Sequence, residues 1–144
     1  MPGILVGIDG SGHSQRALEW AMKEAALRHA PLTVLAVRQA VTGWGGVEPY
    51  PGDNALIDQT AQKAKAETDK VLASLDGPHP ESVTVRAVQG FPAEEIATAG
   101  ADADLIVLGS HGAGGWTRLM GSTATKVAHQ ATVPVIIVPS EHRH

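Results

Sequence analysis

The 144-residue chain is long enough for one domain that buries about two-thirds of the surface exposed in its unfolded form. Its net charge of -4 is small and its eleven Lys and Arg residues are scattered, which disfavours nucleic acid as a main partner, because binding the phosphate backbone needs a concentrated basic face. The absence of cysteine excludes disulfides, thiolate metal sites and cysteine catalysis.

The sequence carries no signal for export or for a membrane. Its first residues lack a basic segment, and the apolar run that follows is too short for a signal peptide. No stretch approaches the roughly 18 apolar residues that span a bilayer. We therefore expect a cytoplasmic protein with no membrane partner, in which residues 1–140 form a single domain and residues 141–144 a tail.

Five short runs rich in β-branched and aliphatic residues predict five strands. They cover residues 4–8, 32–37, 83–88, 105–108 and 135–138. Most are continuous apolar runs, which is typical of strands buried on both faces of a parallel sheet. The third run alternates through Thr84 and Arg86, which predicts an edge strand.

Four segments between these runs predict helices. They cover residues 14–30, 54–75, 92–100 and 122–131. The first carries Leu18, Met22 and Ala25 at helical spacing, and Pro92 suits the first turn of the third. The regular alternation of strand and helix specifies an α/β fold, with a parallel sheet and helices on both faces.

Open parallel sheets bind ligands beyond the carboxyl ends of their strands, where the strand order reverses. If the order is 3-2-1-4-5, the first and fourth strands are neighbours across that point. Asp9 follows the first strand and Gly109 follows the fourth, so these positions are where we first look for a ligand. By itself, Asp9 is equally compatible with a capping or turn role.

The densest glycine segment of the chain, GSHGAGGWTRLMGST at residues 109–123, predicts a phosphate cradle. Glycines let backbone N–H groups approach an anion without interference from a Cβ atom. Gly121, Ser122 and Thr123 are expected to open a helix, whose first N–H groups are unsatisfied and carry partial positive charge. The alternative on chemistry alone is a plain glycine-rich turn after a strand.

Several familiar sites are absent from the sequence. The glycine segment has no Gly-Lys-Ser/Thr and is not a Walker A loop, and residues 10–15 lack the third glycine of the dinucleotide fingerprint. The seven histidines show no i, i+4 pair of ligands on one helix face, so we expect no metal site of the protein's own. Ser110, His111 and Asp9 are the residue types of a hydrolase triad, but the sequence lacks the G-x-S-x-G motif that would present the serine, so we do not expect a hydrolase.

Three segments of the chain form a recognisable set: VGIDGSGHSQRALEWAMKEAALRHAPLTVLAV at residues 6–37, VQGFPAEEIATAGADADLIVLGSHGAGG at 88–115 and GSTATKVAHQATVPVIIVP at 121–139. Together they closely resemble the universal stress protein family. The resemblance implies a UspA-like domain with a Rossmann-like open five-stranded parallel sheet. It also implies a homodimer formed through the last strand.

The ATP-binding branch of this family has the signature Gly-x2-Gly-x9-Gly-Ser/Thr. Gly109 and Gly112 match its first two glycines, and Gly121 with Ser122 matches its end. The second spacer, residues 113–120, holds eight residues instead of nine. The resemblance thus implies a phosphate site with one residue missing from its loop.

The resemblance also implies the rest of a nucleotide site. The aspartate matching Asp9 meets the nucleoside, and backbone around Gly7, Ile8 and Val37 lines the adenine pocket. The expected ligand is ATP with magnesium, and the expected function is a regulator or sensor in stress response. Two alternatives remain open: a slow ATPase, for which the sequence identifies no general base, and a stress protein that does not bind ATP and acts through dimerisation.

Overall fold

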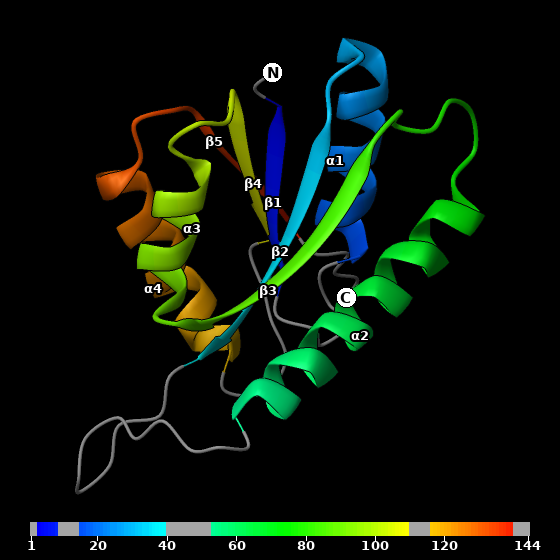
Figure 1. The fold of residues 1–144 in the computed structure, drawn as a ribbon. Coiled ribbons are helices and arrows are strands. Elements are labelled where there is room, and N and C mark those ends of the chain that lie inside the picture. The colour runs from blue at the N-terminus through cyan, green and yellow to red at the C-terminus, as the bar shows by residue number, and fades with distance from the viewer. Residues whose placement is uncertain (1–2, 9–14, 40–52, 110–115, 140–144) are drawn as a thin grey trace, which may run out of the picture.

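The computed structural model describes residues 3–8, 15–39, 53–109 and 116–139, in which strands and helices alternate (Figure 1). The elements are β1 (Ile4–Ile8), α1 (Gln15–Arg28), β2 (Leu32–Gln39), α2 (Asp53–Ser74), β3 (Val83–Gly90), α3 (Pro92–Gly100), β4 (Leu105–Gly109), α4 (Trp116–Gln130) and β5 (Val135–Val138). The five predicted strands are confirmed, and β2, β3 and β4 run one or two residues beyond their predicted ends.

The strands form one parallel sheet in the order β3-β2-β1-β4-β5. Ile4 of β1 lies opposite Leu32 of β2 on one side and Leu105 of β4 on the other. β1 therefore lies in the middle of the sheet. The chain adds β2 and β3 on one side of it and then returns past β1 to add β4 and β5 on the other side. This order confirms the prediction and places β3 at an edge.

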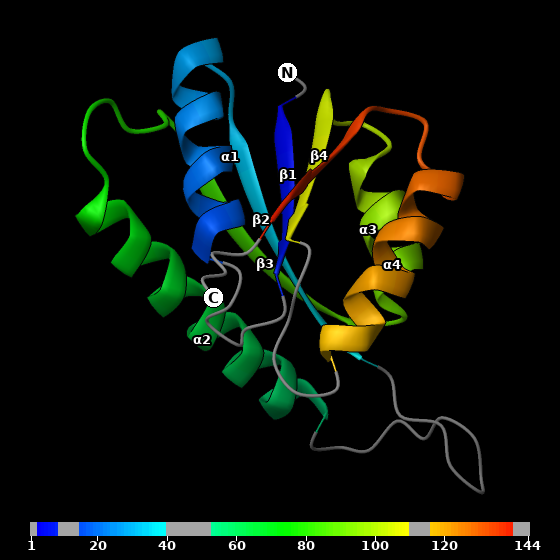
Figure 2. The ribbon, with the colours of Figure 1, turned by 180° about the vertical axis from the view of Figure 1, so that it is seen from behind.

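Helices cover both faces of the sheet, with α1 and α2 on one side and α3 and α4 on the other (Figures 1 and 2). Because side chains alternate along a strand, Ile4, Val6 and Ile8 pack into the cluster under α1 and α2, while Leu5 joins the cluster under α3 and α4. In the described parts of the chain, every helix is too short or too polar to cross a bilayer.

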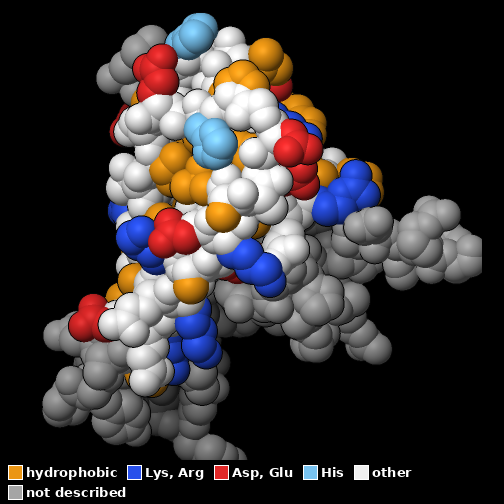
Figure 3. Space-filling view, turned by 90° about the vertical axis from the view of Figure 1, so that its right-hand side faces the viewer, with side chains coloured by type: hydrophobic (Ala, Val, Ile, Leu, Met, Phe, Trp, Pro, Cys, Tyr) orange, Lys and Arg blue, Asp and Glu red, His pale blue; other side chains and the backbone are white. Residues whose placement is uncertain are grey.

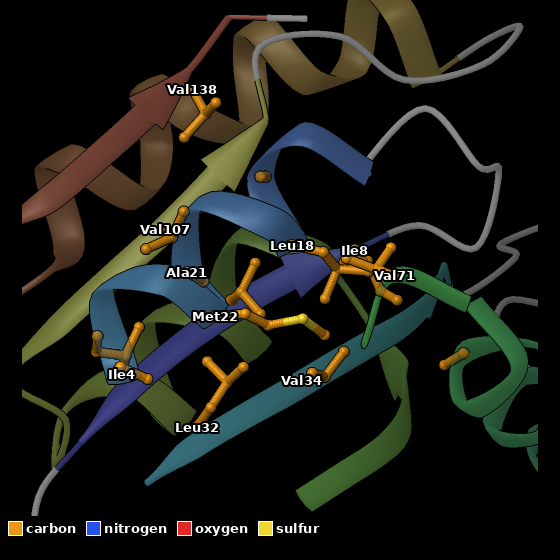
Figure 4. Close-up of a cluster of buried hydrophobic side chains, with 14 of the residues drawn as sticks. Ile4, Ile8, Leu18, Ala21, Met22, Leu32, Val34, Val71, Val107 and Val138 are labelled. Carbon is orange, nitrogen blue, oxygen red and sulfur yellow. The ribbon is translucent and has the colours of Figure 1, made fainter. Parts of the chain in front are cut away.

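The inner face of α1 packs its helically spaced apolar residues into the hydrophobic core. Leu18 and Met22, one turn apart, are fully buried; Leu18 lies beside Ile8 of β1, and Met22 lies beside Val34 of β2 (Figure 4). Burying a side chain of this size stabilises the fold by about 1.5–3 kcal/mol. The helical spacing noted in the sequence thus corresponds to the packed face.

The outer faces of α1 and α2 carry charged pairs at i, i+4 spacing. Lys23 lies 3.2 Å from Glu19, Arg28 lies 2.8 Å from Glu24, and Lys65 lies 3.0 Å from Asp69. Figure 3 shows acidic and basic side chains interspersed over this side of the molecule. Exposed helix pairs contribute only about 0.3–0.5 kcal/mol each, so apolar packing dominates the stability of both helices.

Candidate functional site

The strand order reverses between β1 and β4, at the centre of the sheet. Their paired register runs from Ile4–Leu105 to Val6–Val107, and each strand continues two residues beyond that pair. Ile8 and Gly109 are consequently the last residues of neighbouring strands. The carboxyl ends of β1 and β4 lie at the lower edge of the sheet in Figure 1. A reversal of this kind produces the crevice in which open α/β sheets bind ligands.

Three of the predicted site residues, Gly7, Ile8 and Val37, lie near this carboxyl edge with their side-chain positions packed in the core. Ile8 is 1% exposed beneath α1 and α2, and Val37 is 4% exposed on the opposite face. A Cβ atom on Gly7 would lie 3.0 Å from Ile96 Cδ1 and 3.1 Å from Leu108 Cδ2. Only backbone groups of these residues are therefore available to a ligand at the edge.

Gly109 and Thr123 are also enclosed by protein. Gly109 is buried at the end of β4, opposite Val138 of β5. Thr123 is 6% exposed on the inner side of α4, one turn before the fully buried Val127. The chain leaves β4 at the carboxyl edge, and α4 starts seven residues after Gly109.

The predicted start of the last helix is wrong. Gly121 was expected to open it, but α4 begins at Trp116, so Gly121 and Ser122 lie inside the helix. In an α-helix each N–H beyond the first turn donates to the carbonyl four residues earlier, so those of Gly121 and Ser122 are not free. The N–H groups that lack a partner inside the helix belong to its first turn, about 7 Å nearer the start of the helix axis.

The run Trp-Thr-Arg-Leu-Met, residues 116–120, explains this shift. It contains no glycine or proline to stop a helix, and Arg, Leu and Met are good helix formers. This lack of a breaker is the signal that would have identified the first turn. Asp9, Gly112, Ser110 and His111 lie outside the described residues, and for Gly121 and Ser122 only the helical backbone is described.

Within the described ranges, no group of three His, Asp or Glu side chains is arranged so that it could bind a metal ion. Two of the histidines in these ranges contact groups other than the predicted site residues. The ring Nε2–H of His79 donates to the carbonyl oxygen of Leu72 at 2.8 Å, and His29 Nδ1 lies 3.4 Å from a carboxylate oxygen of Glu81.

Comparison with known proteins gives a consistent result over almost the whole chain. The model of the universal stress protein family matches residues 2–139. A universal stress protein of Mycobacterium tuberculosis is 39% identical over 139 residues, covering 93% of this chain and 44% of the relative. The chain spans about half the length of the first curated relatives that it matches.

Solved structures share the fold. The universal stress protein UspA from Lactobacillus plantarum superimposes with a TM-score of 0.74 at 27% identity, over 95% of this chain and 97% of that one. A universal stress protein in complex with cAMP gives a TM-score of 0.67 at 26% identity, over 97% and 98% of the two chains. The sheet order, the family match and these likenesses agree, and the chain belongs to the universal stress protein family.

Proposed function

We propose that this chain binds ATP at the carboxyl edge of its sheet, between β1 and β4, and acts as a nucleotide-responsive regulator in stress response. The observation that carries the proposal is the reversal of strand order between these two strands, with Ile8 and Gly109 at their ends. The two segments that follow these strand ends in the sequence, one beginning with Asp9 and the other with the glycine loop, are the ones to which we assign the ligand.

Backbone groups at the edge suit the nucleoside end of the ligand. We assign the backbone around Gly7, Ile8 and Val37 to the adenine and Asp9 to the ribose side. Since the side chains of Ile8 and Val37 are core, their N–H and C=O groups are the parts left to recognise a base. The related structure that holds cAMP supports an adenine nucleotide as the ligand class.

We assign the phosphate end to the segment from Gly109 to Thr123. Gly109 and Gly112 precede α4, and the first turn of that helix supplies free N–H groups with partial positive charge. Gly121, Ser122 and Thr123 remain proposed to lie close to the phosphates, from farther along α4, where their N–H groups donate within the helix. Magnesium accompanying ATP would neutralise part of the triphosphate charge.

We propose binding without rapid turnover. The loop lacks the lysine of a Walker A motif, and no residue is identified as a base that orients water near the terminal phosphate. Occupancy by ATP, and not its hydrolysis, is then the signal. We further propose that the protein acts in the cytoplasm.

Thermal unfolding of nucleotide-free protein tests the site. With magnesium-ATP at about 100 times its Kd, the native state gains about 2.7 kcal/mol. For a domain of this size we expect Tm to rise by roughly 5–10 °C. Parallel measurements with ADP, AMP and cAMP show which phosphate groups contribute to the rise in Tm.

The variant Asp9→Ala separates a specific site from general ion effects. It removes the proposed nucleoside contact, so its Tm shift with ATP should shrink while its Tm in buffer alone stays close to that of the wild type. Equal ATP shifts in both proteins would remove Asp9 from the site. No shift in the wild type, once shown to be free of nucleotide, would overturn ATP binding altogether.

We also propose a homodimer through β5. This strand, Val-Ile-Ile-Val, is at the edge of the sheet, and Ile137 is 41% exposed there. An apolar edge strand is a template for pairing with another chain. If ATP binding fails its test, action through this dimer is the function that remains.

A further inference from the structure

A small hollow of about 150 Å³ lies at the amino end of the sheet, away from the proposed nucleotide site. Leu5 of β1 and Thr33 of β2 line it from the sheet, and Ala99, Asp102 and Ala103 line it from the end of α3 and the turn after it. The amino ends of the strands are at the top of Figure 1, near the label N. Nothing in the nucleotide proposal uses this end of the molecule.

Two opposite charges line the hollow from different elements. Arg86 comes from β3, on the face shared with α3 because it stands opposite Leu35, and Asp102 follows α3. Both side chains are exposed. Over the described part of the chain, neither is engaged in an ion pair, with the other or with a third residue. No described residue therefore competes with a ligand for either charge.

The end of α3 adds to the negative side of the hollow. The helix stops at Gly100, has no basic residue in its last turn, and is capped by Ala101 in a helical conformation. The carbonyl oxygens of Thr98 and Gly100 accept hydrogen bonds from the N–H groups of Ala101 and Ala103, at 3.3 and 3.0 Å, and the helix end as a whole carries partial negative charge. This charge and the Asp102 carboxylate both favour a cation, while Arg86 favours a carboxylate, which guanidinium groups can bind in a two-pronged manner.

The hollow is open to solvent, so its volume sets the size of the part of a ligand that it can enclose, a few heavy atoms. A protein cavity of about 150 Å³ holds benzene, which has six heavy atoms. Alanine, with its carboxylate and ammonium groups, also has six. The half-buried Thr33 brings a hydroxyl group to the same hollow.

We propose that this hollow binds a small zwitterion, an α-amino acid of about the size of glycine to serine. Its carboxylate binds Arg86, and its ammonium group binds Asp102 and the end of α3. The competing explanation is that Arg86 only protects the edge strand β3 from pairing with other chains. That explanation requires no ligand.

Titration of the ¹⁵N-labelled protein with L-alanine, followed by NMR, tests the proposal. We expect saturable shifts of the Leu5, Thr33 and Ala103 amides, with Kd in the range of about 1–10 mM, while Thr123 at the other end stays unchanged. Propionate has only the carboxylate and ethylamine only the ammonium group, so each should bind at least roughly tenfold more weakly. Absence of shifts at about 50 mM alanine would overturn the site.

Matched variants test the two charges. Arg86→Gln and Asp102→Asn should each weaken alanine binding roughly tenfold. Arg28→Gln removes an exposed arginine that pairs with Glu24 on α1, and should leave binding unchanged. The spectra themselves report whether each variant is folded. Binding that survives in both hollow variants, or propionate that binds as well as alanine, would reject the zwitterion site.

Discussion

Two glycines let α3 lie close against the sheet. At Gly7 of β1, a Cβ atom would meet Ile96 of α3 at 3.0 Å. At Gly100, the last residue of α3, it would overlap Ile106 Cδ1 and lie 2.5 Å from Ile106 Cγ1. The missing side chains therefore set the distance between helix and sheet on the face that also holds Val37.

Gly100→Ala should destabilise the protein. Ala favours a helix over Gly by up to about 1 kcal/mol, but overpacking against the fully buried Ile106 costs about 1–3 kcal/mol. We expect a net loss of about 1–2 kcal/mol in the free energy of unfolding, measured with urea. The second change Ile106→Val removes the overlapping Cδ1 atom and should recover part of the loss. Additive effects of the two changes would show that the overlap is not the cause.

Residue-level predictions from the sequence were reliable for the core and incomplete for the site. The apolar run that predicted β1 contains Ile8, which is buried as expected of a strand covered on both faces. The same residue was expected at the adenine pocket through its backbone. A sequence pattern reflects the polarity of the side chains, so it identifies core positions well. It says little about which backbone N–H and C=O groups at the end of a strand can bind a ligand.

At the level of elements, the helix α4 is where prediction and structure differ. The sequence predicted that this helix opens at Gly121, Ser122 and Thr123, at the end of the glycine-rich segment. The structure begins the helix five residues earlier, across a run with good helix propensity. A glycine inside a helix costs only about 1 kcal/mol, which the packing of Val127 readily offsets.

Gly121→Ala tests the helix boundary and the phosphate site together. If Gly121 is inside α4, Ala should stabilise the nucleotide-free protein by about 0.5–1 kcal/mol, a rise in Tm of roughly 1–4 °C. If its backbone also approaches the phosphates, the added Cβ should weaken ATP binding roughly tenfold by calorimetry.

The exposed Ala128 on the same helix provides the control. Ala128→Gly should lower Tm by a similar amount and leave the affinity for ATP unchanged. A fall in Tm for Gly121→Ala would contradict the helix starting at Trp116. Unchanged ATP affinity would remove Gly121 from the contacts.

For the whole molecule, the alternation of strands and helices predicted a parallel sheet with two helical layers, because crossover connections between parallel strands are right-handed and return the chain to the sheet. It did not by itself specify the order of the strands. The alternation of Thr84 and Arg86 did predict that β3 is an edge, and the structure confirms it. The opposite edge, β5, gives no such signal, since its four residues are all apolar.

That opposite edge leads to a prediction about assembly. Ile137→Lys places a charge on an exposed apolar position of β5, and charged side chains on edge strands oppose pairing with another chain. We expect light scattering after size exclusion to find a dimer for the wild type and a monomer for this variant. Leu27→Lys is the matched control, because Leu27 is 74% exposed on α1 and not on the edge strand, so its replacement should leave the dimer intact. Because Ile137 is already partly in water, the monomer should stay folded, with a far-ultraviolet circular dichroism spectrum like that of the wild type. A wild type that stays monomeric at all concentrations, or a dimer that survives Ile137→Lys, would exclude β5 as the interface.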